Sequence, residues 1–292
     1  MQGTVTARSP AKLNLHLEVQ SKRDDGFHSI ISIFQMIGLY DEMSCRSLKN
    51  SRICRISGMP DVPLEENSIY RAYQLFQKKT GITHGAVFEV EKSIPKQAGL
   101  GGGSSNAAYA LRMLDLLFAT GLSREELLVM AGELGSDVPF FCGGPCALVT
   151  GRGEHIQPLE ARADLYSVIL VPDFSISTRY AYGEFDTQEP VYPSISSDEL
   201  VRRYREEIPE HWRFFNAFEP VLDEQYPALQ NIIGRLTELG AEYAAMSGSG
   251  SSCYGIFRNR ENAEHALQTC TEDVGNCWFV NLLDKSPNTV LQ

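Results

Sequence analysis

The sequence predicts an α+β protein with two domains. Strand and helix patterns alternate along both halves of the 292 residues, which is typical of mixed α+β folds. The length suits either one large domain or two ordinary ones. A polar, turn-rich stretch at about residues 154–165 divides the chain, so we place the domains at residues 1–160 and 161–284, followed by a tail at residues 285–292.

The predicted N-terminal domain opens with a strand of alternating apolar and polar residues. The apolar face would carry Leu13, Leu15, Leu17 and Val19, and the polar face Lys12, Asn14, His16 and Glu18. The sequence RDDG at 23–26 is a hairpin signal, so residues 27–43 would return as a second strand. The later elements expected here are strands at 51–58 and 86–94, helices at 66–81 and about 106–119, a helix capped by Ser123 and Glu126 that ends at Gly135, and a strand with a tight turn at 143–154.

The predicted C-terminal domain begins with a strongly apolar strand at residues 166–174. Helical patterns follow at 196–208, 216–240 and 260–270. Residues 242–257 read as a strand, a Gly/Ser turn and a second strand, and residues 277–283 as a last strand. From about residue 284 we expect a loose tail.

The composition excludes several classes of function. The chain is 43% hydrophobic and 22% charged, which is ordinary for a globular protein, and its formal net charge of −11 argues against a broad nucleic-acid surface. No apolar run approaches about 18 residues, and no apolar block opens the chain as in a signal peptide, so we expect no membrane span and a cytoplasmic location. The seven cysteines lack zinc-finger spacing and are expected to be reduced and mostly buried.

One segment has a composition that packing does not explain. Residues 98–106 read AGLGGGSSN, with four glycines in five positions directly before a predicted helix. Glycine has no side chain to bury, whereas exposed N–H groups at a helix start suit a phosphate. The segment lacks the lysine of a Walker A loop and the acid of a dinucleotide fingerprint. The alternative to a phosphate site is a flexible helix start. The candidate phosphate-binding residues are Gly99, Leu100, Gly101, Gly102, Gly103, Ser104 and Ser105.

Three further positions remain open on spacing alone. Lys12 is the candidate to bring a positive charge to the phosphate, with Asn14 roughly 6–7 Å away on the same strand face, but that face is equally well read as solvated. The sequence MSGSGSS at 246–252 (the Gly/Ser turn) resembles an anion-binding loop, and also an ordinary hairpin turn. Asp137, in LGSDVPFF, is either a functional carboxylate or a cap for the next helical turn.

Taken together and in order, PAKLNLHLEV, AGLGGGSSNAAYAL and AMSGSGSSCYGIF resemble the three motifs of the GHMP kinases. The resemblance runs from about residue 7 to 283. The segments RDDGFHSI, ENSIYRA, LGSDVPFF and STRYAY narrow it to the family member of non-mevalonate isoprenoid precursor synthesis. It implies an N-terminal ATP-binding α/β domain with a left-handed βαβ unit, a ferredoxin-like C-terminal domain, and an active site in the cleft between them.

The resemblance also implies a role for each matching position. Residues 99–105 would hold the ATP phosphates, with Asn67 and Lys92 near the base or ribose of the nucleotide. Asp137 matches the catalytic aspartate and Lys12 the lysine beside it. The substrate-binding positions would be Asn14, Phe27, His28, Thr178 and Tyr182, with His28 reading a cytosine ring held between Phe27 and Tyr182. Mg²⁺ would arrive with ATP, bound largely by phosphate oxygens and water, with Ser105 as its protein ligand.

Two residues depart from the family pattern. Tyrosine is frequent where Phe27 stands, but stacking on a base needs only the ring. Aspartate is frequent where Asn106 stands, which we expect to cap the helix that follows.

The expected function is ATP-dependent phosphorylation of the 2-hydroxyl of a small cytidine diphosphate substrate. Phosphoryl transfer depends mostly on positioning and on charge neutralisation. Asp137 would orient the hydroxyl and accept its proton late, while Lys12 keeps that carboxylate ionised. The alternatives are another small-molecule GHMP kinase of the homoserine or mevalonate type, a nucleotide-dependent decarboxylase, or a non-catalytic nucleotide-sensing protein on the same scaffold. The oligomeric state cannot be predicted from the sequence.

Overall fold

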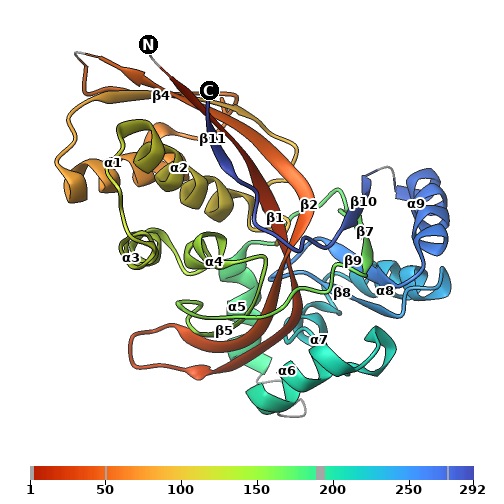
Figure 1. The fold of residues 1–292 in the computed structure, drawn as a ribbon. Coiled ribbons are helices and arrows are strands. Elements are labelled where there is room, and N and C mark those ends of the chain that lie inside the picture. The colour runs from red at the N-terminus through yellow and green to blue at the C-terminus, as the bar shows by residue number, and fades with distance from the viewer. Residues whose placement is uncertain (1–2, 50, 189–194, 275) are drawn as a thin grey trace.

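The computed structural model describes residues 3–49, 51–188, 195–274 and 276–292. Within these residues, seven strands form one sheet and four form a second (Figure 1). The predicted α+β class is confirmed, because helices and mostly antiparallel strands make up both halves of the chain. Of the helices in these ranges, none combines the length and the apolar character needed to cross a membrane.

The larger sheet is built around a long antiparallel pair, β1 (Thr4–Lys22) and β2 (His28–Leu48). The turn between them is the one that RDDG predicts. Helix α1 (Ser68–Thr80) connects β3 (Cys54–Ser57) to β4 (Gly85–Glu91), and these two strands pair in parallel as a βαβ unit. The remaining elements of this half are η1 (Leu64–Glu66), α2 (Gly102–Phe118), α3 (Arg124–Leu134), α4 (Val138–Gly143), β5 (Cys146–Gly151) and β6 (His155–Pro158).

The smaller sheet has the strand order β10-β7-β9-β8, and every pair in it is antiparallel. This order, with helices in the first and last connections, is the ferredoxin-like arrangement that the resemblance implies. Its strands are β7 (Tyr166–Leu170), β8 (Tyr243–Met246), β9 (Cys253–Phe257) and β10 (Cys277–Asn281). Its helical elements are α5 (Thr178–Gln188), α6 (Ser197–Glu206), η2 (Pro209–His211), α7 (Glu219–Leu222), α8 (Ala228–Glu238) and α9 (Arg260–Val274).

The predicted two faces of β1 are wrong beyond Leu15. The register of β1 against β2 shifts between Asn14 and His16, which marks a β-bulge, and an extra residue reverses the side-chain alternation. Leu13 therefore packs in a core cluster with Ile33 and Tyr254, whereas Leu17 joins the other cluster, with Phe34. The polar residues predicted on one face are all buried, so none of this strand face is solvated; they are Lys12, Asn14, His16 and Glu18.

Three element boundaries also differ from the prediction. Helix α2 begins at Gly102 rather than near residue 106, so half of the glycine-rich segment (residues 99–105) is helical. The long helix predicted at 216–240 is interrupted between α7 and α8, where Pro227 has no N–H to continue a helix. Strand β7 ends two residues before Pro172, and α5 occupies a segment where no element was predicted.

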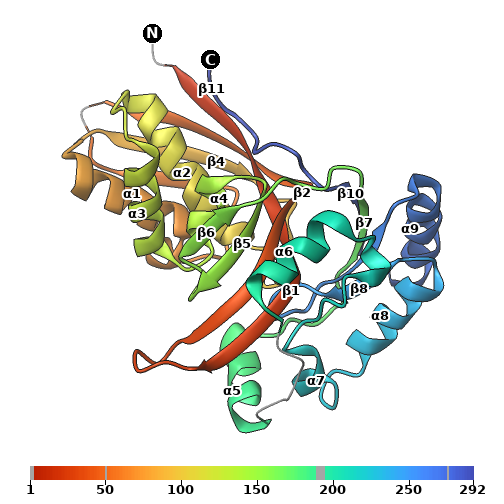
Figure 2. The ribbon, with the colours of Figure 1, turned by 60° about the horizontal axis from the view of Figure 1, so that its bottom comes forward.

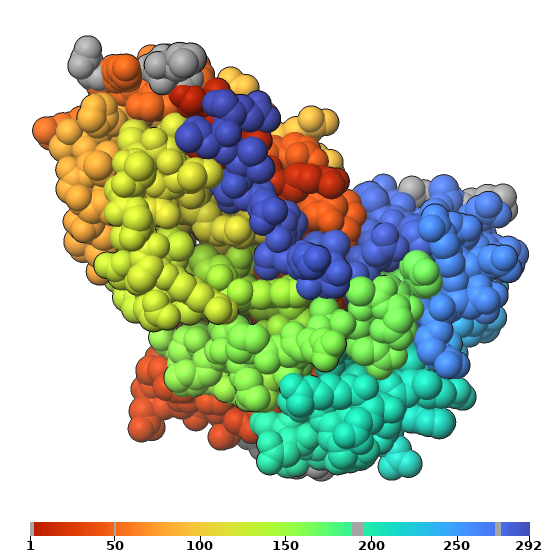
Figure 3. Space-filling model, in the orientation of Figure 1, coloured from red at the N-terminus to blue at the C-terminus, as the bar shows by residue number. Residues whose placement is uncertain are grey.

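The end of the chain is not a loose tail. Strand β11 (Thr289–Leu291) pairs antiparallel with β1, and the carbonyl of Pro287 accepts hydrogen bonds from Tyr109 and Arg112 of α2. Figure 3 shows this last segment lying across the surface beside α2, and Figure 1 shows the two termini close together.

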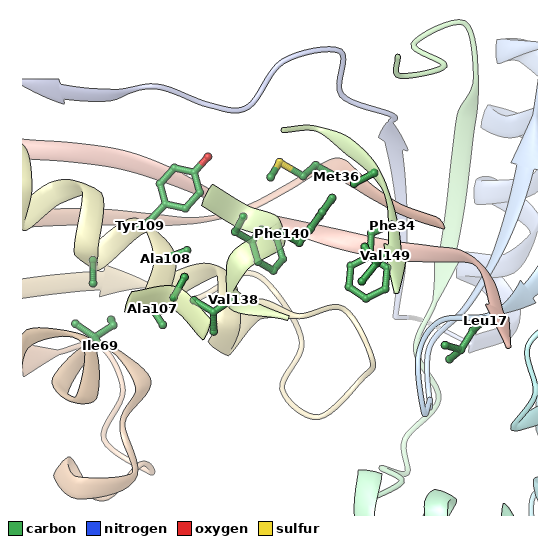
Figure 4. Close-up of a cluster of buried hydrophobic side chains, with 14 of the residues drawn as sticks. Leu17, Phe34, Met36, Ile69, Ala107, Ala108, Tyr109, Val138, Phe140 and Val149 are labelled. Atoms are coloured by element: carbon green, nitrogen blue, oxygen red, sulfur yellow. The ribbon is translucent and has the colours of Figure 1, made fainter. Parts of the chain in front are cut away.

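A core of small and aromatic side chains fixes α4 against α2 and β2. Ala107 and Ala108 of α2 are fully buried near Val138 of α4, and their size lets the two helices approach (Figure 4). The rings of Phe34 on β2 and Phe140 on α4 meet edge to face, 5.2 Å between centroids. The residue before α4 is thereby held close to the β1–β2 pair.

Candidate active site

Among the residues that the structure describes, none caps the start of α2 through a side chain, because the N-cap in the glycine-rich segment is a glycine. Gly101 is the N-cap of α2 and has no side chain to bond the first turn, so the N–H groups of that turn lack both helical and side-chain acceptors. Gly99 and Gly101 adopt φ values of 75° and 71°, a region that L side chains rarely occupy. Ser68 of α1 anchors the turn by donating to the carbonyl of Gly103 at 2.7 Å. A helix start of this kind is suited to an anion.

The Gly/Ser turn packs directly against this segment. It joins β8 to β9 as a hairpin, and Ser247 donates its hydroxyl hydrogen to the carbonyl of Gly99 at 3.1 Å. The N–H of Ser252 donates to the carbonyl of Ala98 at 3.2 Å. A Cβ on Gly99 would lie 1.9 Å from the carbonyl oxygen of Ser247. The turn is therefore a hairpin, as one of the two readings has it, and it holds the glycine-rich segment in place. Anion binding by this turn stays a prediction.

Lys12 and Asp137 face each other beside the start of α2. The Lys12 Nζ lies 3.8 Å from the Asp137 Oδ2, with the lysine side chain 3% exposed and the aspartate 34% exposed. Burial lowers the pKa of Lys12 from its ordinary value, and the Asp137 carboxylate partly restores it. Lys12 also donates to the side-chain oxygen of Asn14 and lies over the ring of Phe34. The ammonium is thus fixed in position, with its charge directed toward Asp137.

The alternative role of Asp137 as a helix cap is not what the structure shows. Asp137 occupies the N-cap position of α4, but its side chain makes no capping hydrogen bond. Its carboxylate instead faces Lys12.

A buried polar network lies beneath the glycine-rich segment. Asp41 is fully buried, pairs with Lys92, and accepts the backbone N–H groups of Ser93 and Ile94 at 3.0 Å each. Asn106 donates to Asp41 at 2.9 Å and accepts from Lys92 at 3.2 Å. Asn106 is therefore inside α2 and does not cap it, which corrects the sequence prediction. An amide suits this position because it can donate to one charged neighbour and accept from the other.

We expect the Asp41→Asn variant to lower the free energy of unfolding by about 3 kcal/mol, because removal of one partner leaves the Lys92 charge poorly compensated in a largely buried place. Urea denaturation measures this change. Glu42→Gln is the matched control, since the Glu42–Arg8 pair is exposed on both sides and should contribute less than about 1 kcal/mol. Equal losses in the two variants would contradict a structural role for the buried pair.

The two residues predicted to lie near the nucleotide, Asn67 and Lys92, both make polar contacts within the protein. Asn67 is buried and accepts from the Ile69 N–H at 3.0 Å as the N-cap of α1, and Lys92 is engaged by Asp41 and Asn106. Lys92 nevertheless lies next to the helix start, because a Cβ on Gly102 would be 3.6 Å from its Nζ. Contact of these two residues with a nucleotide stays a prediction.

Ser105 is fully buried, and its hydroxyl lies 2.7 Å from that of Ser9. A metal ion that used Ser105 as a ligand would have to reach this buried oxygen. Within the described ranges, no three His, Cys, Asp or Glu side chains gather into a set that could hold a metal ion. The residues here thus do not form a metal site of their own.

The predicted substrate residues lie mainly where the β1–β2 hairpin meets α5. The rings of His28 and Tyr182 are 5.2 Å apart, and the ring of Tyr182 meets that of Phe218 at 4.9 Å. Burial raises the pKa of Tyr182 to about 12, and the nearby charge of Asp137 adds to the shift, which connects this group electrostatically to the Lys12–Asp137 pair. Thr178, the first residue of α5, lies next to the Gly/Ser turn, with its hydroxyl 3.0 Å from that of Ser249.

Phe27 is placed differently from the other substrate residues. Its ring is 54% exposed and lies under the Arg152 guanidinium, 5.1 Å from ring centroid to guanidinium carbon. A base held between Phe27 and Tyr182 stays a prediction.

Glu219 is a residue that the sequence did not single out. Its carboxylate accepts the N–H of Met246 at 2.7 Å and so holds the beginning of the Gly/Ser turn. Burial raises its pKa to about 7, with the Met246 hydrogen bond acting in the opposite direction. A lone glutamate in an apparently helical stretch gives no sequence signal, because its burial depends on packing against β8.

We expect Glu219 to make stability fall as pH rises from about 4.5 to about 7. Its pKa in the folded protein, about 7, exceeds the ordinary value of 4.5, so the folded state retains a proton that the unfolded state loses over this interval. Glu219→Gln should remove a fall on the order of 2 kcal/mol, measured by urea unfolding at pH 5 and pH 8. The exposed Glu224→Gln should keep the wild-type dependence. An unchanged pH dependence in Glu219→Gln would refute the assignment.

Family models and curated relatives both match this chain to the same family of proteins. The family model described as GHMP kinases N terminal domain matches residues 67–144, and that described as GHMP kinases C terminal matches residues 199–275. The chain is 35% identical, over 90% of its length and 93% of the relative, to 4-diphosphocytidyl-2-C-methyl-D-erythritol kinase from Thermodesulfovibrio yellowstonii. The corresponding enzyme from Treponema pallidum is 34% identical, over 96% of this chain and 98% of the relative.

Solved structures show the same fold. A crystal structure of 4-(cytidine 5′-diphospho)-2C-methyl-D-erythritol kinase matches with a TM-score of 0.81 and 31% identity, over 95% of this chain and 98% of the other. Homoserine kinase from Cytophaga hutchinsonii matches with a TM-score of 0.76 over 98% of this chain and 97% of the other, but at 17% identity it is similar in fold alone.

Proposed function

Because this chain belongs to the GHMP kinase family, we propose that it transfers the γ-phosphoryl group of ATP to the 2-hydroxyl of 4-(cytidine 5′-diphospho)-2-C-methyl-D-erythritol. The products are the 2-phosphate and ADP, in the synthesis of isoprenoid precursors. A cytoplasmic location belongs to the same proposal. The observation that carries it is the Lys12–Asp137 pair, whose lysine packs against Gly101, the N-cap of α2: a Cβ on Gly101 would lie 3.0 Å from the Lys12 Cγ.

The residues have distinct roles in this reaction. The N–H groups of the glycine-rich segment hold the ATP phosphates, and the positive end of the helix dipole adds to the attraction. Asp137 accepts a hydrogen bond from the substrate hydroxyl and orients its oxygen toward the γ-phosphorus. As the new O–P bond forms and the bond to ADP breaks, the hydroxyl acidifies and its proton passes to Asp137. Lys12 balances the negative charge of the transferring group.

Magnesium is part of the proposal only as a companion of ATP. Mg²⁺ bound to the phosphates would neutralise their charge during transfer. Because Ser105 is buried against Ser9, we assign the ion mainly to phosphate oxygens and water. Ser104, which is partly exposed in the first turn of α2, is the more accessible hydroxyl.

The test is the release of ADP in a coupled assay with three acceptors. We expect turnover with the diphosphocytidyl methylerythritol compound and none above background with homoserine or mevalonate. Faster turnover with homoserine or mevalonate would assign the chain to another substrate class. ATP binding without ADP release for any acceptor would support a nucleotide sensor.

A further inference from the structure

Asp186 on α5 connects the C-terminal half to the β1–β2 hairpin. Its Oδ2 lies 2.7 Å from the Lys22 Nζ, and its Oδ1 lies 2.8 Å from the His28 Nε2. Lys22 ends β1 and His28 begins β2, so a single carboxylate contacts both sides of the hairpin. Figure 2 shows α5 beside this hairpin, and Figure 1 shows the same neighbourhood from another side. No motif in the sequence points to Asp186.

Both ring nitrogens of His28 lie next to oxygen atoms of the protein. The Nδ1 lies 2.8 Å from the carbonyl oxygen of Gln20, and since a carbonyl only accepts, the Nδ1 carries a hydrogen. The Nε2 is buried and lies 2.8 Å from the Asp186 Oδ1 without a hydrogen bond between them, and the imidazole is only 6% exposed. The rings of Tyr182 and Phe185, from the same helix as Asp186, pack against the imidazole at 5.2 and 5.7 Å. The ring of His28 is therefore held in place, with no nitrogen directed at solvent.

Asp186, by contrast, is partly open to a ligand. One third of its side chain is exposed (33%). Lys22 uses one lone pair of the Oδ2, and the Oδ1 accepts no hydrogen bond from the His28 Nε2, so both oxygens keep lone pairs for a ligand. The hydrogen bond from Lys22 lowers the pKa of Asp186 below its ordinary value. The electrostatic attraction of His28 adds to this effect, and burial opposes it. The group is thus an ionised acceptor that cannot donate.

We propose that Asp186 is a specificity-determining residue that accepts the exocyclic amine of the substrate's cytosine. This inference rests on the proposed function. Cytosine presents an amine donor at the position where uracil presents a carbonyl oxygen, and an aspartate or glutamate is a suitable acceptor for that amine. A carboxylate there attracts cytosine and repels uracil. Tyr182, one helical turn before Asp186 on the same face of α5, would contact the ring of the base.

The experiment compares the binding of cytidine monophosphate and uridine monophosphate by calorimetry, with saturating ADP present to occupy the ATP site. Wild type should bind the cytidine compound at least about 10-fold more tightly, which corresponds to about 1.4 kcal/mol. Asp186→Asn should reduce this ratio to about 3-fold or less, because an amide can donate to uracil as readily as it accepts from cytosine. Glu184→Gln, which changes a carboxylate two positions earlier on α5, should keep the wild-type ratio.

A second variant separates recognition of the base by Asp186 from the structural contact that Asp186 makes between the hairpin and α5. Lys22→Met removes the hairpin partner of Asp186 but leaves the carboxylate, so it should weaken both nucleotides while keeping their ratio. If Asp186 only ties the hairpin to α5, Asp186→Asn will also weaken both nucleotides equally, and an unchanged ratio of this kind would overturn the proposal. A wild type with no preference for cytidine would overturn it as well. Failure of the proposed function shows separately, as absent ADP release, because the binding ratio needs no turnover.

Discussion

Replacing Asp137 by asparagine is expected to lower kcat by about 10²–10⁴-fold, the range over which a positioned general base contributes. The amide retains the shape of the carboxylate, but it cannot accept the hydroxyl proton as the O–P bond forms. The fold should be unaffected, because the Asp137 side chain caps no helix. The KM for ATP should change little, since the N–H groups of α2 that we propose to bind the phosphates remain in place.

Steady-state ADP release measures this loss. Two further variants are compared with it, one at the partner of Asp137 and one as a control. Lys12→Met should cause a loss of similar size, because it removes the charge that faces both Asp137 and the transferring group. Asp164→Asn is the matched control, since Asp164 lies on the exposed surface, where it pairs with Arg162. It should keep turnover within about twofold of wild type. If Asp137→Asn also stays within that margin, Asp137 is not the base.

Replacing Gly99 by alanine is expected to raise the KM for ATP at least tenfold and to cost about 2 kcal/mol of stability or more. The new Cβ would lie 1.9 Å from the carbonyl oxygen of Ser247, a backbone atom that cannot rotate away. In addition, the φ of 75° at Gly99 is strained for alanine by about 1–2 kcal/mol. Relief requires the glycine-rich segment to move away from the Gly/Ser turn, which displaces the N–H groups that would hold the phosphates.

Gly121→Ala separates the steric clash from the backbone strain. Gly121 has a similar φ of 66°, but nothing lies within 4 Å of where its Cβ would be. This variant should lose about 1–2 kcal/mol of stability from strain alone and keep the wild-type KM for ATP. Urea denaturation and ATP titration of turnover measure both quantities. Equal KM values for the two variants would show that the Gly/Ser turn does not position the ATP site.

Local patterns were sufficient for the elements whose cause is local. The RDDG turn and the capping box of Ser123 and Glu126 were predictable, because each depends on residues within a few positions of one another. A helix after the glycine-rich segment was predictable as well, but its start at Gly102 was not. The reversal of side-chain faces after Leu15 was not predictable either, since the bulge arises from the pairing of β1 with β2. The pairing of β11 with β1 likewise depends on a partner almost 300 residues away in the chain.

The site divides in the same way. Lys12 and Asp137 could be selected from motifs, but whether the lysine was solvated and whether the aspartate was a cap depended on tertiary packing. Three acidic residues could not be identified from the sequence, because the role of each depends on partners far away in the chain; they are Asp41, Asp186 and Glu219. Burial of Ser105 against Ser9 could not be foreseen either, as it depends on where β1 crosses α2.

The central claim is that the Lys12–Asp137 pair and the start of α2 converge on one phosphoryl group. The most direct measurement is a crystal structure with a non-hydrolysable ATP analogue and the diphosphocytidyl methylerythritol substrate bound together. We expect the β- and γ-phosphates on the N–H groups of the glycine-rich segment, and the substrate 2-hydroxyl within about 3 Å of the Asp137 carboxylate. A γ-phosphate bound elsewhere, or an acceptor hydroxyl out of reach of Asp137, would contradict the claim.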